Sequence, residues 1–466
     1  MRFSAAITAE RLLPQRMALR AKPLLDRVDG LLFATDERGE AGRISLIAFV
    51  VRVVSAVIAF ASQVLMARWM GSFEYGILVL VWTTAIIVGS LACLGFHTSV
   101  IRFIPEYRER GLLAELRGIL LASRLFVLGI STLVAALGAL GVWFLSDWME
   151  SYYVVPFLLG ALCLPMIALT DLLQGIARAH SWALFALTPT YIMRPLLILA
   201  FMALAVWTGF APDARTGILA SIAATYATSV VQLAGVTRRI DLKLPGGPMA
   251  IHLGQWFMIS LPIFLVESFF FLLTNADVLM VGFYLQPDDV AVYFATVKTL
   301  ALVHFVYFAV KAGVATRYAQ FMHGQPDRLA AFARETVSWT FWPSLAMAAL
   351  VLVLGEPMLT LFGPEFVAGY PLLFLLVLGV VARAAVGPCE SLLTMTGNQN
   401  ICAFVYALTL ALNIGLNVAL IPHFHLWGAA MSTAFAMFFE AAALSYTVWR
   451  RFGFVMAIFV PARTVS

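Results

Sequence analysis

Long apolar stretches dominate this 466-residue sequence and limit what it can fold into. A bilayer core about 30 Å thick is crossed by a helix of about 20 apolar residues, and the sequence contains twelve stretches of about that length. Hydrophobic residues make up 62% of the chain and charged residues 12%, whereas a soluble domain has about 25% charged residues. We therefore expect an all-α polytopic membrane protein and exclude an ordinary soluble enzyme.

The apolar stretches divide evenly between the two halves of the chain. In the first half we predict helices over residues 44–66, 77–94, 118–145, 154–176, 183–208 and 217–235. In the second half we predict helices over residues 256–285, 291–316, 339–362, 371–395, 401–421 and 427–449. The expected organisation is a tail over 1–43, a six-helix bundle over 44–240, a linker over 241–255, a second bundle over 256–449 and a tail over 450–466.

Basic residues are distributed unequally between the two sides of this arrangement. The tails and the loops on their side carry 22 Lys and Arg residues, whereas the opposite loops carry two, Arg68 and Arg215. Basic loops are retained on the cytoplasmic side, so both termini and the linker should be cytoplasmic. The first 43 residues also contain six acids, and transit peptides are poor in acids. That composition favours a cytoplasmic tail over a mitochondrial presequence.

Several functions are excluded by what the sequence lacks. The predicted outer loops are about ten residues or shorter, which leaves no room there for an external catalytic domain. The sequence has no Gly-Lys dipeptide, so it has no Walker A phosphate loop. The four cysteines form no CxxC pair, and His423 and His425 have no acid or thiolate beside them. We expect no enzymatic activity, no cofactor, no metal and no nucleic-acid partner.

The two halves resemble each other in pattern. Residues 64–66 and 278–280 both read Val-Leu-Met, 214 residues apart, and each triplet precedes a short loop with an acid and a tyrosine. Each half has six predicted spans and starts on the cytoplasmic side. The halves therefore form a parallel repeat, an arrangement in which transporters rock two bundles around a central site.

Six basic residues lie inside predicted spans, where a charge near the bilayer centre costs about 2.5–3.5 kcal/mol. They are Arg52, Arg124, Arg194, Lys298, Lys311 and Arg383. Such a charge must face a partner helix, an aqueous cavity or an anionic ligand. We predict that all six bind substrate and that three line an aqueous cavity between the bundles: Arg52, Arg194 and Arg383.

Structural explanations for some of these charges stay open. Arg124 and Lys311 lie near the cytoplasmic ends of their spans and can extend toward water. Arg383 and Glu390 are seven residues apart and would share one face of a continuous helix. In the simplest structural alternative, the buried charges only pair with one another and hold helices together.

Acidic residues also occur at depth in the predicted spans. Glu267, Asp277 and Glu440 are our candidates for ion coupling, because burial disfavours the charged carboxylate and basic neighbours favour it. A carboxylate between these two influences can exchange a proton or bind sodium. The expected coupling ion is therefore H⁺ or Na⁺.

Three segments carry a resemblance to a known family. They are Arg68–Gly76 (RWMGSFEYG), Leu94–Tyr107 and Ala276–Gly282 (ADVLMVG). With these segments the chain, from about residue 44 onward, resembles the polysaccharide transporter branch of the multidrug/oligosaccharidyl-lipid/polysaccharide exporter superfamily. The resemblance implies a V-shaped pair of six-helix bundles with a central cavity in the bacterial inner membrane.

The resemblance also implies a function. Members of this branch are O-antigen and exopolysaccharide flippases, which move an undecaprenyl-pyrophosphate-linked oligosaccharide to the outer leaflet for polysaccharide or lipopolysaccharide biosynthesis. The implied partners are this lipid-linked oligosaccharide, membrane lipids, a polysaccharide polymerase and other glycan assembly proteins. Some relatives have fourteen spans, and the absence here of an extra pair argues against a lipid II substrate.

The buried arginines suit such a substrate, because guanidinium groups bind phosphate through paired hydrogen bonds. Two alternatives stay open. An ion-coupled multidrug exporter of the same superfamily would bind cationic amphiphiles, for which acids and aromatic rings without nearby arginines are the better site. The chain would otherwise be a membrane scaffold for glycan assembly that transports nothing.

Overall fold

The computed structural model describes residues 37–242, 244–324 and 326–459, which are almost entirely helical. The first half contains α3 (Glu37–Leu91), α4 (Phe96–Glu109), α5 (Leu113–Phe144), η1 (Ser146–Trp148), α6 (Ser151–Ala161), α7 (Leu164–Ala179), α8 (Ala183–Thr188), η2 (Pro189–Met193), α9 (Arg194–Trp207) and α10 (Ala214–Asp241). The second half contains α11 (Leu253–Leu273), α12 (Ala276–Tyr284), α13 (Pro287–Gly324), α14 (Pro326–Phe362), η3 (Pro364–Gly369), α15 (Tyr370–Val386), α16 (Cys389–Met395), α17 (Gln399–Phe424) and α18 (Leu426–Phe452).

Helix α3 contains the first two predicted spans and folds back on itself. A straight helix of 55 residues would be about 80 Å long at 1.5 Å per residue, far more than a bilayer is thick. The backbone reverses at Gly71, whose φ of 77° is readily adopted only by glycine. The Tyr75 hydroxyl then donates to Gln63 Oε1 at 2.6 Å, a contact that a straight helix could not make across twelve residues.

The described residues supply the twelve crossings that the sequence predicts. They include 10 helices long and apolar enough to span a bilayer, and the bent pair of α6 and α7 adds one more crossing. The longest segment begins with α3, which crosses twice because of its reversal at Gly71. The prediction of an all-α polytopic membrane protein with about 12 transmembrane helices is confirmed.

Several spans expected to be continuous are interrupted at mid-depth. The span predicted over 154–176 bends by 44° between α6 and α7, just before Pro165. The span over 183–208 contains the π-helical turn η2, which begins at Pro189. The span over 371–395 breaks at Gly387 and Pro388, because Gly387 has a φ of 66° and proline has no backbone N–H.

The span predicted over 256–285 is also broken, between α11 and α12. The Thr274 hydroxyl and the Asn275 amide both donate to the carbonyl of Phe271. Short polar side chains that bond to nearby carbonyls in this way compete with the helical hydrogen bonds. The break separates the oblique helix α11 from α12 in the second bundle.

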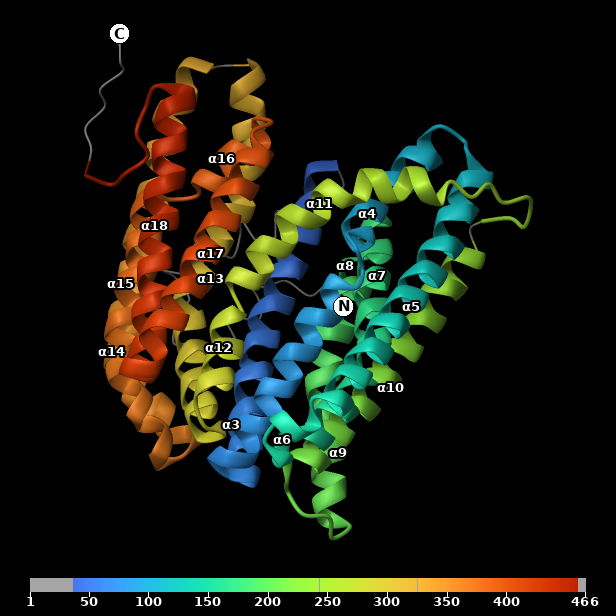
Figure 1. Cartoon of the computed structure of the whole chain (residues 1–466). Coiled ribbons are helices and arrows are strands. Elements are labelled where there is room, and N and C mark those ends of the chain that lie inside the picture. Colours follow the sequence, from blue (N-terminus) through green and yellow to red (C-terminus); the bar gives the residue numbers. More distant parts are fainter. Residues whose placement is uncertain (1–36, 243, 325, 460–466) are drawn as a thin grey trace, which may run out of the picture.

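The helices form two lobes arranged as a V (Figure 1). We call α3–α10 the N-lobe and α12–α18 the C-lobe. The lobes meet at one end, here named the closed end, and separate at the other, the open end. Helix α11 crosses between them, with its start against α4 and its end against α17.

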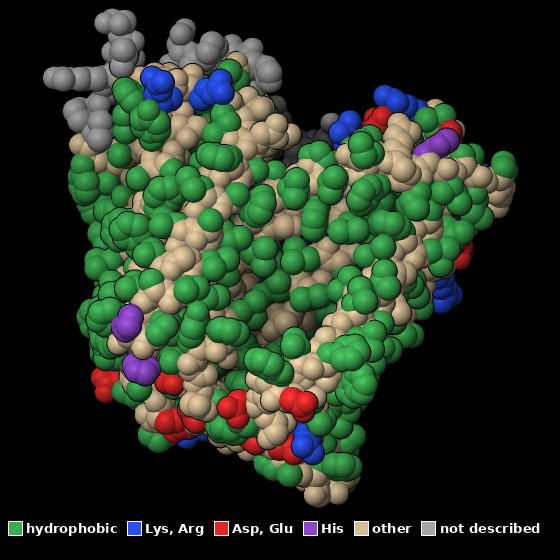
Figure 2. Space-filling model, viewed as in Figure 1, with side chains coloured by type: hydrophobic (Ala, Val, Ile, Leu, Met, Phe, Trp, Pro, Cys, Tyr) green, Lys and Arg blue, Asp and Glu red, His purple; other side chains and the backbone are tan. Residues whose placement is uncertain are grey.

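The surface reflects this arrangement (Figure 2). The space-filling view is hollowed between the lobes at the open end, where Lys and Arg side chains lie on both rims. Acidic side chains gather mainly along the closed end. The V shape with a central cavity, expected from the sequence, is thus present.

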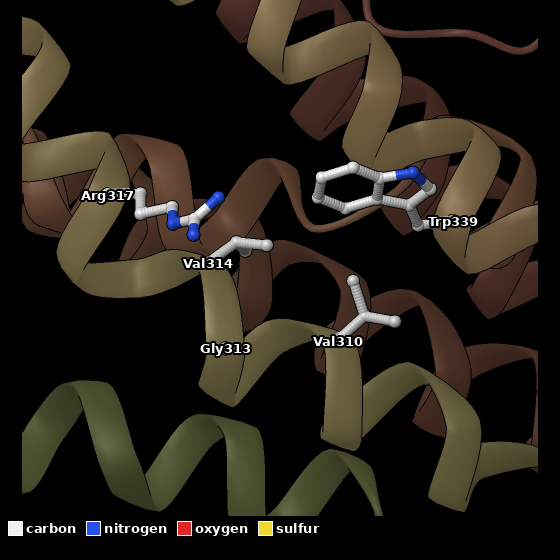
Figure 3. A pocket seen from close by; sticks show the side chains of 5 residues that line it. All are labelled: Val310, Gly313, Val314, Arg317 and Trp339. Carbon is white, nitrogen blue, oxygen red and sulfur yellow. The ribbon is translucent and has the colours of Figure 1, made fainter. Parts of the chain in front are cut away.

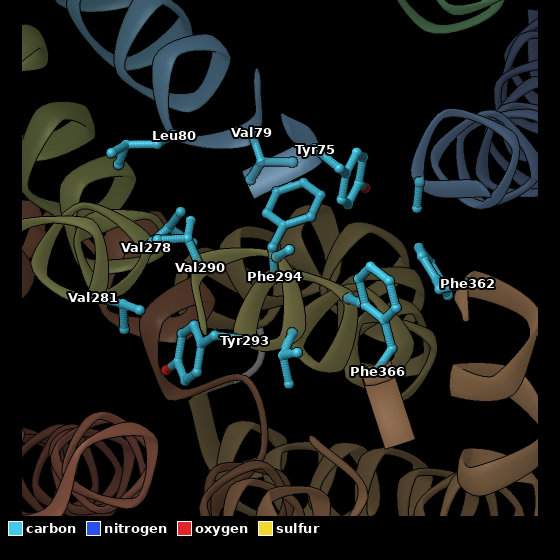
Figure 4. Close-up of a cluster of buried hydrophobic side chains, with 14 of the residues drawn as sticks. Tyr75, Val79, Leu80, Val278, Val281, Val290, Tyr293, Phe294, Phe362 and Phe366 are labelled. Atoms are coloured by element: carbon cyan, nitrogen blue, oxygen red, sulfur yellow. The ribbon is translucent and has the colours of Figure 1, made fainter. Parts of the chain in front are cut away.

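An aromatic cluster joins the lobes at the closed end (Figure 4). Tyr75 of α3, which is fully buried, makes edge contacts with Phe294 of α13 and Phe366 of η3, with ring centroids 6.4 and 6.2 Å apart. Phe60 of α3 makes a similar contact with Phe362 of α14 at 5.4 Å. We call these five residues the closing cluster, because their rings pack between the lobes at the closed end.

Polar contacts surround the closing cluster and also cross between the lobes. Arg68 donates from Nε and Nη2 to the last carbonyls of α14, those of Leu361 and Thr360, each at 2.7 Å. The Ser72 hydroxyl donates to Asp288. The backbones also approach closely, since a Cβ on Gly76 would lie 1.8 Å from the carbonyl oxygen of Pro287. The segment Arg68–Gly76 therefore forms much of the contact between the lobes.

Candidate functional site

Lys298 lies on α13, next to the closing cluster. Helix α13 rises from the closed end, and Lys298 follows Phe294 of the closing cluster by four residues, or about 6 Å. The Nζ atom is 4.7 Å from the Phe294 ring centroid. The side chain is exposed. Among the described residues it has no acidic partner.

Arg194 provides a second cation with unused donors, inside the N-lobe. It begins α9 directly after the π-helical turn, and such turns are frequent at functional sites. The guanidinium lies 5.5 Å from the Trp82 ring centroid, and its Nη1 is buried without a hydrogen-bond partner in the described chain. The nearby acid, Asp171, accepts from the Ser90 hydroxyl at 2.6 Å and makes no direct bond to Arg194.

The structure describes the side chain of Arg124 but not that of Arg52. Arg52 lies in the first arm of α3, eight residues or about 12 Å toward the open end from Phe60, and its side chain falls outside the described residues. Arg124 lies between α5 and α10, where Nη1 donates to the Thr237 hydroxyl at 3.1 Å. Its Nε and Nη2 are buried and have no partner among the described residues.

The other two deep cations are paired with acids in the C-lobe. Lys311 of α13 donates to Glu390 Oε1 of α16 at 2.7 Å. Arg383 of α15 lies 3.1 Å from Glu440 of α18, as an ion pair rather than a well-aligned hydrogen bond. The expected Arg383–Glu390 stripe is wrong, because the break at Gly387 and Pro388 ends the helix between them.

Aromatic rings enclose these two ion pairs. The Arg383 guanidinium lies 4.8 Å from the Tyr307 ring centroid and 5.8 Å from that of Phe270. Lys311 Nζ lies 5.3 Å from Phe270. Arg383 is 5% exposed and Glu440 2%, so this pair does not border the open cavity in this conformation. The role of Arg383 in substrate binding stays a prediction.

Asp277 lies in a buried polar cluster of the C-lobe. Its Oδ2 accepts from the Thr433 hydroxyl at 2.7 Å, and its Oδ1 accepts from Asn417 Nδ2 at 3.5 Å. The same Nδ2 donates to Asn413 Oδ1 at 3.0 Å, and the Tyr293 hydroxyl lies 3.0 Å from that of Thr433. Carboxylate, amide and hydroxyl oxygens are the atoms that hard cations prefer. This cluster can hold a proton or a sodium ion.

Sequence reasoning missed the neutral members of this cluster. Asn413 and Asn417 lie four residues apart in α17 and so on one helix face, and both are buried. That spacing of amides in an apolar span was the available signal. The contribution of Thr433 depends on how α18 packs against α12, which no local pattern reveals.

Glu267 lies at the contact between α11 and the N-lobe. Both of its carboxylate oxygens accept from the Thr98 hydroxyl at 2.9 Å, and His97 Nε2 lies 3.2 Å away. His97 and Thr98 begin α4. Glu267 therefore attaches a helix of the second half to the N-lobe, and its role in ion coupling stays a prediction.

Two further hollows lie outside the central cavity. The larger, of about 550 Å³, is lined mainly by apolar residues of α3, α5, α6 and α7. The smaller, of about 290 Å³, is lined by residues of α13 and α14, with Arg317 and Trp339 facing the same space (Figure 3). Arg317 is the single charged residue that lines either one.

Solved structures of transporters share this fold. An inward-facing multidrug resistance transporter of the MATE family, of the MOP superfamily, superposes with a TM-score of 0.73 at 12% identity, covering 87% of this chain and 98% of that one. The lipid II flippase MurJ in an inward closed conformation gives 0.67 at 14% identity, covering 86% and 87%. An outward-facing MATE transporter gives 0.60 at 12% identity, covering 91% and 97%.

The fold and the family matches define this chain as a transporter-type member of the multidrug/oligosaccharidyl-lipid/polysaccharide exporter superfamily. Residues 42–316 match the family described as Polysaccharide biosynthesis protein, and the chain belongs to that family. Residues 262–419 also match the MatE family. A search of curated proteins found no match.

Proposed function

We propose that this protein is a flippase for an undecaprenyl-pyrophosphate-linked oligosaccharide, moving it from the cytoplasmic to the outer leaflet of the bacterial inner membrane. Membership of the Polysaccharide biosynthesis protein family supports this substrate class. A glycan on a pyrophosphate cannot cross hydrocarbon unaided, because burying hydroxyls and phosphate charges without partners is prohibitive. In this proposal the central cavity provides the polar route, and its open end faces the cytoplasm.

The observation that carries the proposal is the unpaired positive charge of Lys298, beside the closing cluster. Lys298 is exposed and has no acidic partner among the described residues, whereas the deep acids Glu390, Glu440 and Asp277 are paired or hydrogen-bonded. Removing an unpaired ammonium from water is costly unless an anion joins it. A pyrophosphate is such an anion.

The buried cluster around Asp277 is our proposed site for the coupling ion, H⁺ or Na⁺. It lies in the C-lobe beside α12, and Tyr293 of α13 connects it to the helix that carries Lys298. An ion bound here would favour one arrangement of α12, α13 and α18 over another. Movement of α13 would then alter the cavity floor and the closing cluster together.

Glycan export in a strain lacking its own copy of the protein tests the proposal. Lys298→Met should reduce surface polysaccharide at least tenfold, with normal abundance in the membrane. Lys298→Arg should retain much of the export, because it keeps the charge. Arg215→Met is the matched control, since Arg215 is an exposed basic residue at the closed end and should export normally. Normal export by Lys298→Met would contradict the proposal.

The MatE match over residues 262–419 favours one second candidate, an ion-coupled multidrug exporter. A cation substrate would be repelled by Lys298 and would depend on acids such as Asp277 or Glu267. The same strains separate the two functions. Deletion of a drug exporter would leave surface polysaccharide intact and lower resistance to a cationic dye, and Lys298→Met would not reduce that resistance.

A further inference from the structure

Two ion pairs with similar separations lie in the C-lobe, and one of them is more exposed than the other. The side chains of Arg383 and Glu440 are 6% and 2% exposed, whereas those of Lys311 and Glu390 are 26% and 15% exposed. Lys311 lies thirteen residues beyond Lys298 on α13, about 20 Å nearer the open end. A substrate entering from the open end therefore meets Lys311 before Lys298.

The Glu390 carboxylate uses only one of its oxygens. Oε1 accepts from Lys311 Nζ at 2.7 Å, whereas Oε2 is buried and has no hydrogen-bond partner in the described chain. A buried carboxylate oxygen without a donor is unfavourable. Ionised Glu390 is therefore held mainly by Lys311, and Oε2 is a free position for a proton.

The other titratable groups around Glu390 do not replace Lys311. Arg383 on α15 is occupied by Glu440 of α18, which is itself an acid. Among the described residues, the other titratable groups near Glu390 are Tyr307 on α13 and Cys402 and Tyr406 on α17. In their usual neutral forms these three supply no positive charge. If Lys311 turns to another anion, the carboxylate loses its one direct cationic contact.

We propose that Glu390 is a proton-binding site linked to pyrophosphate binding at Lys311. This inference rests on the proposed function. A phosphate oxygen of the substrate takes the place of Glu390 Oε1 on the Lys311 ammonium, and Glu390 takes one proton from water at Oε2. Lys311 keeps its three protons throughout, so each anion that binds is accompanied by one proton from solution.

This exchange is reciprocal, because two linked binding events change each other's affinity by the same factor. A proton on Glu390 releases Lys311 and strengthens anion binding. Loss of that proton restores the Lys311–Glu390 pair and weakens anion binding. Anion binding at this site should therefore be stronger at low pH than at high pH.

Isothermal titration of the purified full-length protein with farnesyl pyrophosphate, a short isoprenoid pyrophosphate, tests the inference. Repeating the titration in buffers of different ionisation enthalpy gives the number of protons taken up on binding. We expect the wild type to take up about one proton more than Glu390→Gln at the same pH. One linked proton also makes the wild-type affinity fall about tenfold more per pH unit than that of the variant.

Matched variants separate this site from general effects of charge. Glu356→Gln removes an exposed carboxylate of the same lobe and should keep the wild-type proton count. Lys298→Met should weaken binding but keep the proton difference, because it leaves the Lys311–Glu390 pair intact. If Glu390→Gln does not fold, the neutral pair Lys311→Met/Glu390→Gln replaces it and should also lack the extra proton.

The outcomes distinguish this inference from the function on which it rests. Binding with equal proton counts in the wild type and Glu390→Gln overturns the role of Glu390 alone. Absence of farnesyl pyrophosphate binding to the wild type overturns the proposed function, and this inference with it. If the doubly neutral variant takes up as many protons on binding as the wild type, the assignment is also overturned, because the proton would then bind elsewhere.

Discussion

The two lobes share an architecture but use their buried charges differently. In the C-lobe, Lys311 and Arg383 are paired with Glu390 and Glu440. In the N-lobe, Arg124 and Arg194 keep guanidinium nitrogens without partners among the described residues. The difference shows that the cations with unused donors in the N-lobe are guanidinium groups, whereas two of the three deep cations of the C-lobe are paired with acids and only Lys298 has none among the described residues.

The largest effect on stability should come from breaking the buried ion pair between Arg383 and Glu440 in the C-lobe. Arg383→Met would leave Glu440 buried without a counter-charge, and such a change costs about 3–5 kcal/mol. We expect the unfolding temperature of the purified protein to fall sharply. The double variant Arg383→Met/Glu440→Leu should recover much of the loss, because no lone charge remains. An unchanged unfolding temperature for Arg383→Met would show that buried Glu440 does not need Arg383 as its counter-charge.

The corresponding change in the N-lobe should affect export rather than folding. Arg194→Ala removes a cation with unused donors, and hydrogen bonds to a charged group contribute about 1.5–3 kcal/mol. Export should therefore fall roughly ten- to hundredfold at normal abundance. Arg194→Lys should restore only part of it, since lysine lacks the planar paired donors.

Arg52→Ala extends this prediction to the first arm of α3. We expect the same loss of surface polysaccharide at normal membrane abundance. Normal export by both alanine variants would remove the proposed substrate role of the N-lobe cations and leave only a structural role.

A smaller effect should distinguish the ion site of the C-lobe. A site for sodium around Asp277 would stabilise the fold by about 1.4 kcal/mol at ten times the dissociation constant. Asp277→Asn should abolish the sodium-dependent rise in unfolding temperature, whereas Asp147→Asn, outside the cluster, should keep it. If sodium has no effect on the wild type, the proton remains as the coupling ion, and the pH dependence of export should then be lost in Asp277→Asn.

The smallest effect should arise where the lobes touch. Arg68 is exposed and donates to the carbonyls of Thr360 and Leu361, and exposed charged contacts contribute little. Arg68→Met should shift the balance toward states open at the closed end by about two- to fivefold. Cysteine labelling of a position near Phe362 by a water-soluble reagent measures this shift. Equal labelling in the two proteins would show that Arg68 does not stabilise the closed end.

The sequence predicted the fold well, because hydropathy and loop charge report directly on membrane crossings. It could not predict where spans break. Gly387 and Pro388 were visible, but the same residue types occur in unbroken helices, such as Pro343 within α14. That break separated Arg383 from Glu390 and paired each with a residue distant in sequence.

The candidate site was only partly predictable for the same reason. The presence of charges at depth follows from hydropathy alone, so Lys298, Arg194 and Asp277 could be selected. Their partners depend on packing between helices: Asp277 meets Thr433 of α18, 156 residues away. Neutral polar residues such as Asn413 give no comparable signal, because an amide in an apolar span is far less unusual than a charge.

The closing cluster also determines where the membrane potential acts. Little of the voltage falls across a wide, water-filled opening, because water conducts ions. The field is concentrated over the short apolar layer formed by Tyr75, Phe294 and Phe366, where each elementary charge experiences about 2.3 kcal/mol per 100 mV. In the proposed function, in which the open end faces a negatively charged cytoplasm, an anion held at Lys298 would be driven outward electrophoretically as soon as that layer opens.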